Sequence, residues 1–255
     1  MSARRPPPAY AHLVLRIIDA RIGELVDAAP VRRGLTRVEA HVPGFDITAL
    51  RLLLVTDLLV RALELGGTPV WALLTAPREA AELRAGAAAL GIRPFEDARE
   101  IGTGLGEAQV LHVVGTGGTV PDGVRVEVAP VLPDGAGVPQ GTDPTVLRLA
   151  LLGHPRGAPL HLEPTVLTDA EHTLGRWRRA VAGWATRPSR PVPDEVRVRL
   201  RTAWEDDLDV PEVLNVLRWV EEAGPDLPEG ARFETYAYAD RLLGLELTRD
   251  LGTLV

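Results

Sequence analysis

The chain has 255 residues and a formal net charge of −7, with 45% hydrophobic and 25% charged residues. This length suffices for one or two folded domains, the composition is ordinary for a globular protein, and the negative charge argues against DNA as a partner. All 28 basic side chains are arginine, because the sequence contains neither lysine nor cysteine, which excludes Schiff-base lysines, disulfides and thiolate metal ligands.

The sequence predicts no membrane anchor and no secretory signal. Residues 1–8 include three consecutive prolines and no long apolar core. The longest apolar stretch, 50–65, is interrupted by four charged residues and is too short to span a bilayer. We therefore expect a cytoplasmic protein without a membrane partner.

The first half of the chain alternates between strand-like and helix-like patterns. A short apolar run occupies 12–18, further strands are predicted at 36–42, 69–74 and 109–114, and helices are predicted at 50–65 and 77–90. Strands that alternate with helices are typical of a parallel sheet with covered faces. The predicted fold class is therefore α/β, with a reduced Rossmann-like sheet followed by an all-α helical bundle.

The pattern changes at residue 115. Between 115 and 141, glycine, proline and aspartate recur around one alternating strand at 124–128. From Asp143 onwards the pattern is helical, with predicted helices at 143–153, 164–185, 193–205, 210–223 and 231–246. We predict a Rossmann-like nucleotide-binding-derived domain at 1–114, a linker or trimmed insertion at 115–142, and a helical bundle domain at 143–255.

Six short motifs occur in order at 15–24, 37–44, 57–63, 143–149, 205–214 and 239–245. The second is similar to a family segment that ends in Tyr-Val-Cys-Gly, and the fourth is similar to an Asp-Pro-x-x-Leu-Arg element. The last contains Leu-Leu-Gly-Leu, as the family's closing motif does. Together the six segments resemble the class I cysteinyl-tRNA synthetase family, including its shorter relative, the cysteine ligase of mycothiol synthesis.

The resemblance implies an ATP site, but its first signature is degenerate here. A His-x-Gly-His motif is expected at about 46–49, and no histidine lies between His41 and His112. Gly44, Asp46 and Thr48 stand at the degenerate ATP-site position. An aspartate facing a polyphosphate would repel it, so no cofactor is expected, with ATP as the alternative if the chain is an active ligase.

Two further parts of the family's machinery are missing. The lysine-rich second signature should precede Asp143, yet residues 133–140 contain no basic side chain. The resemblance also implies a zinc ion, but the family's first cysteine ligand corresponds to Pro43, so no metal site is predicted. No catalytic residue is predicted either, since His41, His112 and His172 lack the sequence context of a known catalytic motif.

The helical half carries an arginine-rich stretch that includes Trp177 and Trp184. Its candidate RNA-binding residues are Arg176, Arg178, Arg179, Arg187 and Arg190. Arginine and tryptophan together can bind phosphates and stack on bases, and the resemblance implies that these helices could face a tRNA. The alternative is a set of solvent-exposed helix faces, with both tryptophans packed inside the bundle.

Three functions are compatible with these patterns. The leading hypothesis is a catalytically inactive relative of the synthetase family that binds a protein partner in a regulatory or scaffolding role. The first alternative is a diverged ATP-dependent ligase that forms a cysteinyl or other aminoacyl adenylate. The second alternative is a tRNA- or RNA-binding module.

Overall fold

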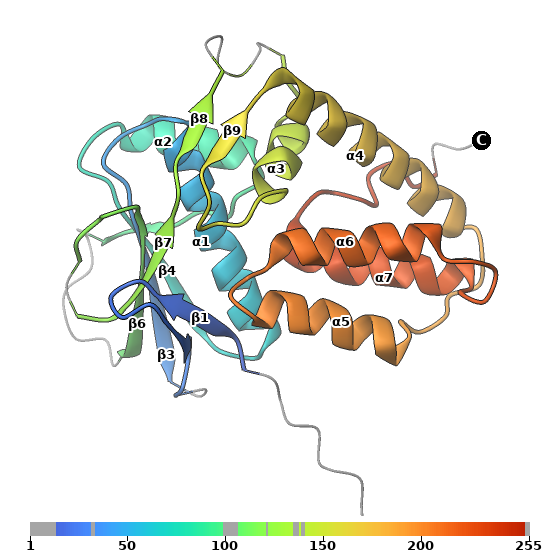
Figure 1. Cartoon of the computed structure of the whole chain (residues 1–255), viewed down its shortest axis with the longest axis horizontal. Coiled ribbons are helices and arrows are strands. Elements are labelled where there is room, and N and C mark those ends of the chain that lie inside the picture. The colour runs from blue at the N-terminus through green and yellow to red at the C-terminus, as the bar shows by residue number, and fades with distance from the viewer. Residues whose placement is uncertain are drawn as a thin grey trace, which may run out of the picture.

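The structure, a computed structural model, describes residues 14–31, 34–98, 107–120, 122–134, 138 and 141–252. Residues 1–8 and most of the stretch 133–140, which entered the predictions above, lie outside these ranges. Figure 1 shows a sheet on one side of the molecule, helices on the other, and α1 between them.

The described strands are β1 (Arg16–Asp19), β2 (Glu24–Asp27), β3 (Leu35–His41), β4 (Val70–Thr75), β5 (Glu96–Asp97), β6 (Glu107–Gly115), β7 (Val124–Val128), β8 (Val131–Pro133) and β9 (Leu160–Leu162). The described helices are α1 (Ile47–Leu65), α2 (Ala80–Ala89), α3 (Pro144–Leu152), α4 (Pro164–Trp184), α5 (Asp194–Glu205), α6 (Val210–Glu222) and α7 (Glu229–Leu243). None of these helices combines the length and apolar character needed to cross a bilayer.

Five strands form a parallel sheet in the order β5-β4-β3-β6-β7. Within this sheet, β3 is the first strand in sequence. The strands β4 and β5 follow on one side of it, and β6 and β7 then lie on its other side. This is the strand order 3-2-1-4-5 of one Rossmann-type sheet, whose direction of winding reverses between β3 and β6. The predicted Rossmann-like α/β fold followed by helices is confirmed.

The two faces of this sheet differ in chemistry. Successive side chains of a strand point to opposite faces, and the apolar set of β3 and β6, which includes Val38 and Val113, belongs to the main hydrophobic core. Helix α1 packs along this face against β3, β4, β6 and β7. The alternate residues place Glu39, His41 and His112 on the opposite face.

The predicted linker at 115–142 contributes two strands to the fold. The strand predicted at 124–128 is confirmed as β7, which pairs with β6 at the edge of the central sheet. Strand β8 pairs in parallel with β9, which follows α3. The interpretation of this segment as a hinge or trimmed insertion, and the domain limits around it, stay predictions.

The helical half packs around buried aromatic side chains. Trp177, Trp204 and Tyr236 are fully buried, and the Tyr236 ring lies edge-on to both Trp177 and Trp184. The Tyr236 hydroxyl donates to the Leu217 carbonyl oxygen at 2.8 Å, which joins α7 to α6. Burial raises the pKa of this hydroxyl far above its usual range, because ionisation would place a charge in the apolar interior.

Candidate functional site

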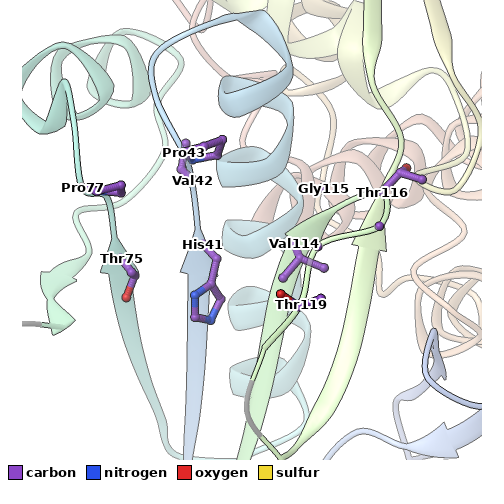
Figure 2. A pocket seen from close by; sticks show the side chains of 11 residues that line it. His41, Val42, Pro43, Thr75, Pro77, Val114, Gly115, Thr116 and Thr119 are labelled. Atoms are coloured by element: carbon purple, nitrogen blue, oxygen red, sulfur yellow. The ribbon is translucent and has the colours of Figure 1, made fainter.

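A cavity of about 410 Å³ opens at the carboxyl ends of β3, β4 and β6. Its lining consists of residues 41–43, Thr75, Pro77 and 114–119, which Figure 2 shows converging from the three strand ends. In doubly wound sheets, ligands bind outside the carboxyl ends of the strands, where the winding reverses. The cavity lies at this point, so it is the candidate binding site of the fold.

The cavity lining is almost uncharged. The described residues that line it include no arginine, aspartate or glutamate, and His41 is the titratable member of this lining. The glycine-rich loop after β6 closes one side in a turn, in which the Gly118 amide donates to the Gly115 carbonyl oxygen at 2.9 Å. No helix begins directly after this turn, so the loop lacks the helix N-terminus that typically completes a phosphate site.

The three residues predicted at the ATP-site position lie together at the N-terminus of α1. Asp46 is the N-cap of this helix, and its carboxylate accepts a hydrogen bond from the Ala49 amide at 2.6 Å. The Thr48 hydroxyl accepts from the Val131 amide at 3.1 Å and thereby fixes β8 against α1. The contacts of the Asp46 carboxylate and the Thr48 hydroxyl therefore stabilise the local fold.

A second carboxylate also lies at this helix N-terminus. Glu79 Oε2 accepts a hydrogen bond from the Phe45 amide at 2.8 Å, and a Cβ atom on Gly44 would lie 2.8 Å from the same oxygen. Arg78, the neighbouring cation, donates to the Pro43 carbonyl oxygen at 3.2 Å. Phosphate-binding helix termini offer free backbone amides and a positive partial charge. Here the Asp46 carboxylate binds one amide of the first turn, and the Glu79 carboxylate binds the Phe45 amide just before the N-cap.

The five arginines predicted as RNA contacts are not equivalent. Arg178 is buried and donates to the carbonyl oxygens of Leu245 and Glu246. Arg176 and Arg187 form ion pairs with Glu221 and Glu229.

The remaining two, Arg179 and Arg190, are exposed. Trp177 is buried, its indole N–H donates to Glu221 at 3.0 Å, and Trp184 is buried as well. The two tryptophans thus pack inside the bundle, as the alternative interpretation expected, and RNA binding by the exposed arginines stays a prediction.

A polar cluster under the cavity was missed by the sequence analysis. His41 Nε2 lies 2.9 Å from His112 Nδ1, and the Glu39 carboxylate lies 3.8 Å from the first and 3.9 Å from the second. The Thr75 hydroxyl donates to Glu39 Oε1 at 2.5 Å. The signal in the sequence was the i, i+2 spacing of Glu39 and His41, but His112 comes from β6 and joins them only through the register of the sheet.

Burial disfavours the charged form of both imidazoles in this cluster. Burial lowers the pKa of His41, with the Glu39 carboxylate opposing this effect and Arg37 adding to it. Burial also lowers the pKa of His112, and the neighbouring His41 lowers it further. A neutral imidazole can offer a ring nitrogen as a hydrogen-bond acceptor or as a metal ligand.

Comparison with curated proteins finds similar ligases. The L-cysteine:1D-myo-inositol 2-amino-2-deoxy-alpha-D-glucopyranoside ligase of Streptomyces scabiei is 39% identical over 112 residues, which cover 42% of this chain and 26% of the relative. The ligase of the same name from Frankia alni is 41% identical over 91 residues, covering 35% of this chain and 21% of the relative. The resemblance to the mycothiol cysteine ligases is confirmed. No protein-family model matches the chain.

The similarity covers part of each protein. A third ligase of that name, from Cellulomonas flavigena, is 35% identical over 114 residues, which cover 43% of this chain and 26% of the relative. The matched part thus amounts to about a quarter of the length of these relatives. The chain is related to synthetase-like ligases, and the activity of the whole relatives enters below only as a proposal.

The groups that the family resemblance implies do not fit the corresponding residues. Pro43 lines the cavity at the position of the family's first zinc-binding cysteine, and its side chain has no donor atom. At the position of the first ATP signature, Asp46 and Glu79 present carboxylates to the N-terminus of α1. We therefore derive no chemical step through ATP or through the family's zinc.

Proposed function

We propose that this chain is a relative of the synthetase-like ligases that does not form an adenylate and acts by binding, in a regulatory or scaffolding role. The observation that carries the proposal is the pair of carboxylates at the N-terminus of α1. Asp46 and Glu79 accept hydrogen bonds from the backbone amides of Ala49 and Phe45, and they place two carboxylates where the family's first ATP signature is expected.

Electrostatics support the loss of ATP binding. Two unit charges of the same sign about 4 Å apart repel by roughly 4 kcal/mol at an effective dielectric constant of about 20. A triphosphate at this helix terminus would face two such carboxylates. Arg78 lies beside them and donates to the Pro43 carbonyl oxygen, so one neighbouring cation stands against two negative charges. In enzymes, loss of a single hydrogen-bond donor that stabilises the transition-state charge costs about 3–4 kcal/mol. Repulsion by two carboxylates should therefore be enough to prevent adenylate formation.

The proposed partner is another protein, and the β1–β2 hairpin is the surface that supports this. Ile18, Ile22 and Leu25 are 40%, 58% and 37% exposed. Ile18 and Leu25 pair across the hairpin, so two of these apolar side chains lie side by side on it. Contiguous apolar patches mark protein interaction sites, whereas single exposed apolar side chains are normal on a surface, and we propose this cross-strand pair as the centre of such a patch.

The decisive experiment is ATP–pyrophosphate exchange with cysteine, together with calorimetric titration of ATP. We expect no exchange above the heat-inactivated protein and no measurable ATP binding. The double variant Asp46→Asn/Glu79→Gln keeps hydrogen-bond acceptors at both positions and removes both charges, so it should gain weak ATP affinity. Glu82→Gln is the matched control, because Glu82 is exposed in the first turn of α2, and it should leave the result unchanged.

The diverged ligase is the second candidate, because the curated proteins to which the chain is similar are ligases. The same assay separates the two functions. Cysteine-dependent exchange by the unmodified chain, or tight ATP binding by it, would replace the proposed binding role with an active ligase that uses different residues.

A further inference from the structure

Three side chains with metal-binding atoms meet on the sheet face opposite α1. The ligand atoms of Glu39, His41 and His112 all lie within 4.8 Å of one another. We propose that these three residues form a binding site for a divalent transition-metal ion, with zinc as the best match. The site is independent of the proposed loss of adenylate formation.

The choice of zinc follows from the ligand set. Two imidazoles and one carboxylate, with a fourth position left to water or substrate, are a known protein ligand set for zinc. Imidazole nitrogen suits zinc and other late transition metals, whereas calcium and magnesium take oxygen ligands.

The distances are compatible with coordination after a small movement. Two ligand atoms about 2.0–2.2 Å from a tetrahedral zinc ion lie roughly 3.3–3.6 Å apart. The His41 Nε2–His112 Nδ1 separation of 2.9 Å is shorter than this, and the separations of 3.8 and 3.9 Å to Glu39 are longer. A shift of a few tenths of an ångström would exchange the imidazole–imidazole hydrogen bond for two metal–nitrogen bonds.

The cluster has one side open to the cavity. The His41 side chain is 23% exposed and lines the cavity, while those of Glu39 and His112 are 11% and 2% exposed. Figure 2 shows the His41 ring on the face of the sheet that is turned away from α1. A metal held by the three residues would therefore direct its free position toward the cavity, where water or a small ligand can bind.

Neighbouring residues orient the carboxylate and limit the charge. The Thr75 hydroxyl donates to Glu39 Oε1, in the way that outer-shell groups position metal ligands. Arg37 Nε lies 3.9 Å from Glu39 Oε2, and its positive charge makes the affinity lower than that of the same ligands alone. The site also differs from the family's zinc site, whose first cysteine position is Pro43.

The test uses the full chain after treatment with a chelator, with Zn²⁺ and Co²⁺ as the added ions. We expect one Co²⁺ per chain, a visible absorption spectrum typical of four or five coordination, and displacement of Co²⁺ by Zn²⁺. Loss of an outer-shell partner weakens metal sites by about 10–100-fold. We expect His41→Gln, which removes a ligand, to weaken binding by at least about 100-fold and Thr75→Val by about 10-fold.

His161→Gln is the matched control, because His161 is an exposed histidine on β9, and it should bind as the unmodified chain does. Binding of less than one ion per chain, or unchanged affinity in both His41→Gln and Glu39→Gln, would overturn the proposal. If His112→Gln fails to fold because its side chain is buried, the half-buried His41 alone decides the question. Either outcome is distinguishable from the ATP measurements, since no nucleotide is present.

Discussion

Arg51 is a fully buried cation in α1 that binds only backbone carbonyl groups in the contacts described for it. Its guanidinium donates to the oxygens of Ala129, Pro155 and Ala158 at 2.8–2.9 Å. Burial lowers the pKa of Arg51 to about 10, because the charged form loses its hydration. The side chain therefore stays protonated near neutral pH and joins α1 to the segments on either side of α3.

We predict that Arg51→Met lowers the free energy of unfolding by about 3 kcal/mol or more, since each buried polar group left without a partner costs about 1–3 kcal/mol. The matched control is Arg84→Met, because Arg84 is 49% exposed and pairs with Asp97 at 3.4 Å, and it should cost less than about 1 kcal/mol. Urea unfolding followed by circular dichroism gives both values. Equal losses in the two variants would contradict the role assigned to Arg51.

Two glycines inside helices differ in the space around them, so alanine substitutions there should have opposite effects on stability. A Cβ atom on Gly183, near the end of α4, would meet no heavy atom within 4 Å, whereas one on Gly230, in α7, would lie 2.0 Å from the Pro188 carbonyl oxygen. We expect Gly183→Ala to stabilise the protein by about 0.5–1 kcal/mol through helix propensity. Gly230→Ala should destabilise it by about 1–3 kcal/mol, because the backbone of the loop between α4 and α5, which contains Pro188, must move.

Thermal unfolding of the two variants provides the comparison, and each serves as the control for the other. A loss of stability in Gly183→Ala would show that α4 packs differently near its end. An unchanged melting temperature in Gly230→Ala would show that the loop at 186–190 is free to move away from α7.

Most of the elements could be predicted because their apolar residues repeat with a helical or strand period. Helix α1 starts at Ile47, three residues before its predicted start. The prediction followed the apolar repeat from Leu50, whereas the helix begins directly after its N-cap, Asp46. Helix α2 starts at Ala80 instead of Pro77, since Glu79 has a left-handed backbone conformation with φ 53°. Strand β2 was not predicted, because it is mostly exposed and lacks an alternating apolar pattern.

The candidate site was only partly predictable. The sequence singled out Asp46 and Thr48 as the degenerate ATP-site position, which stays a prediction. Only the structure shows that a second carboxylate, Glu79, lies at the same helix terminus. In the same way, His41 and His112 are 71 residues apart in the sequence, and no local motif relates them. Their contact depends on the register between β3 and β6, which a single sequence does not contain.

At the scale of the whole molecule, Asp57 links the sheet layer to the helical bundle. This buried carboxylate in α1 accepts hydrogen bonds from Arg61 at 2.8 Å, Arg93 at 2.9 Å and Arg148 of α3 at 3.3 Å. Arg148 also donates to the Leu243 carbonyl oxygen at the end of α7. The polar positions of α1 therefore lie in part at an internal interface, and the two halves should unfold together.

We predict one cooperative unfolding transition for the chain and a loss of about 3–5 kcal/mol in Asp57→Ala, which leaves buried arginine charge without its partner. Glu64→Ala is the control, because Glu64 is 44% exposed and pairs with Arg93, and it should cost less than about 1 kcal/mol. Circular dichroism and tryptophan fluorescence during urea unfolding should coincide. Two separate transitions in the unmodified chain would contradict the coupling.

The cavity rests on the ends of three adjacent strands rather than on loops alone. His41 lies opposite Thr75 in the register of β3 and β4, and Val114 lies on the neighbouring β6. An occupant of the cavity would therefore slow amide hydrogen exchange deep in the sheet, because its binding energy adds to the cost of separating those strands. Exchange mass spectrometry could thus recognise the natural occupant in a mixture of metabolites, before its chemistry is known.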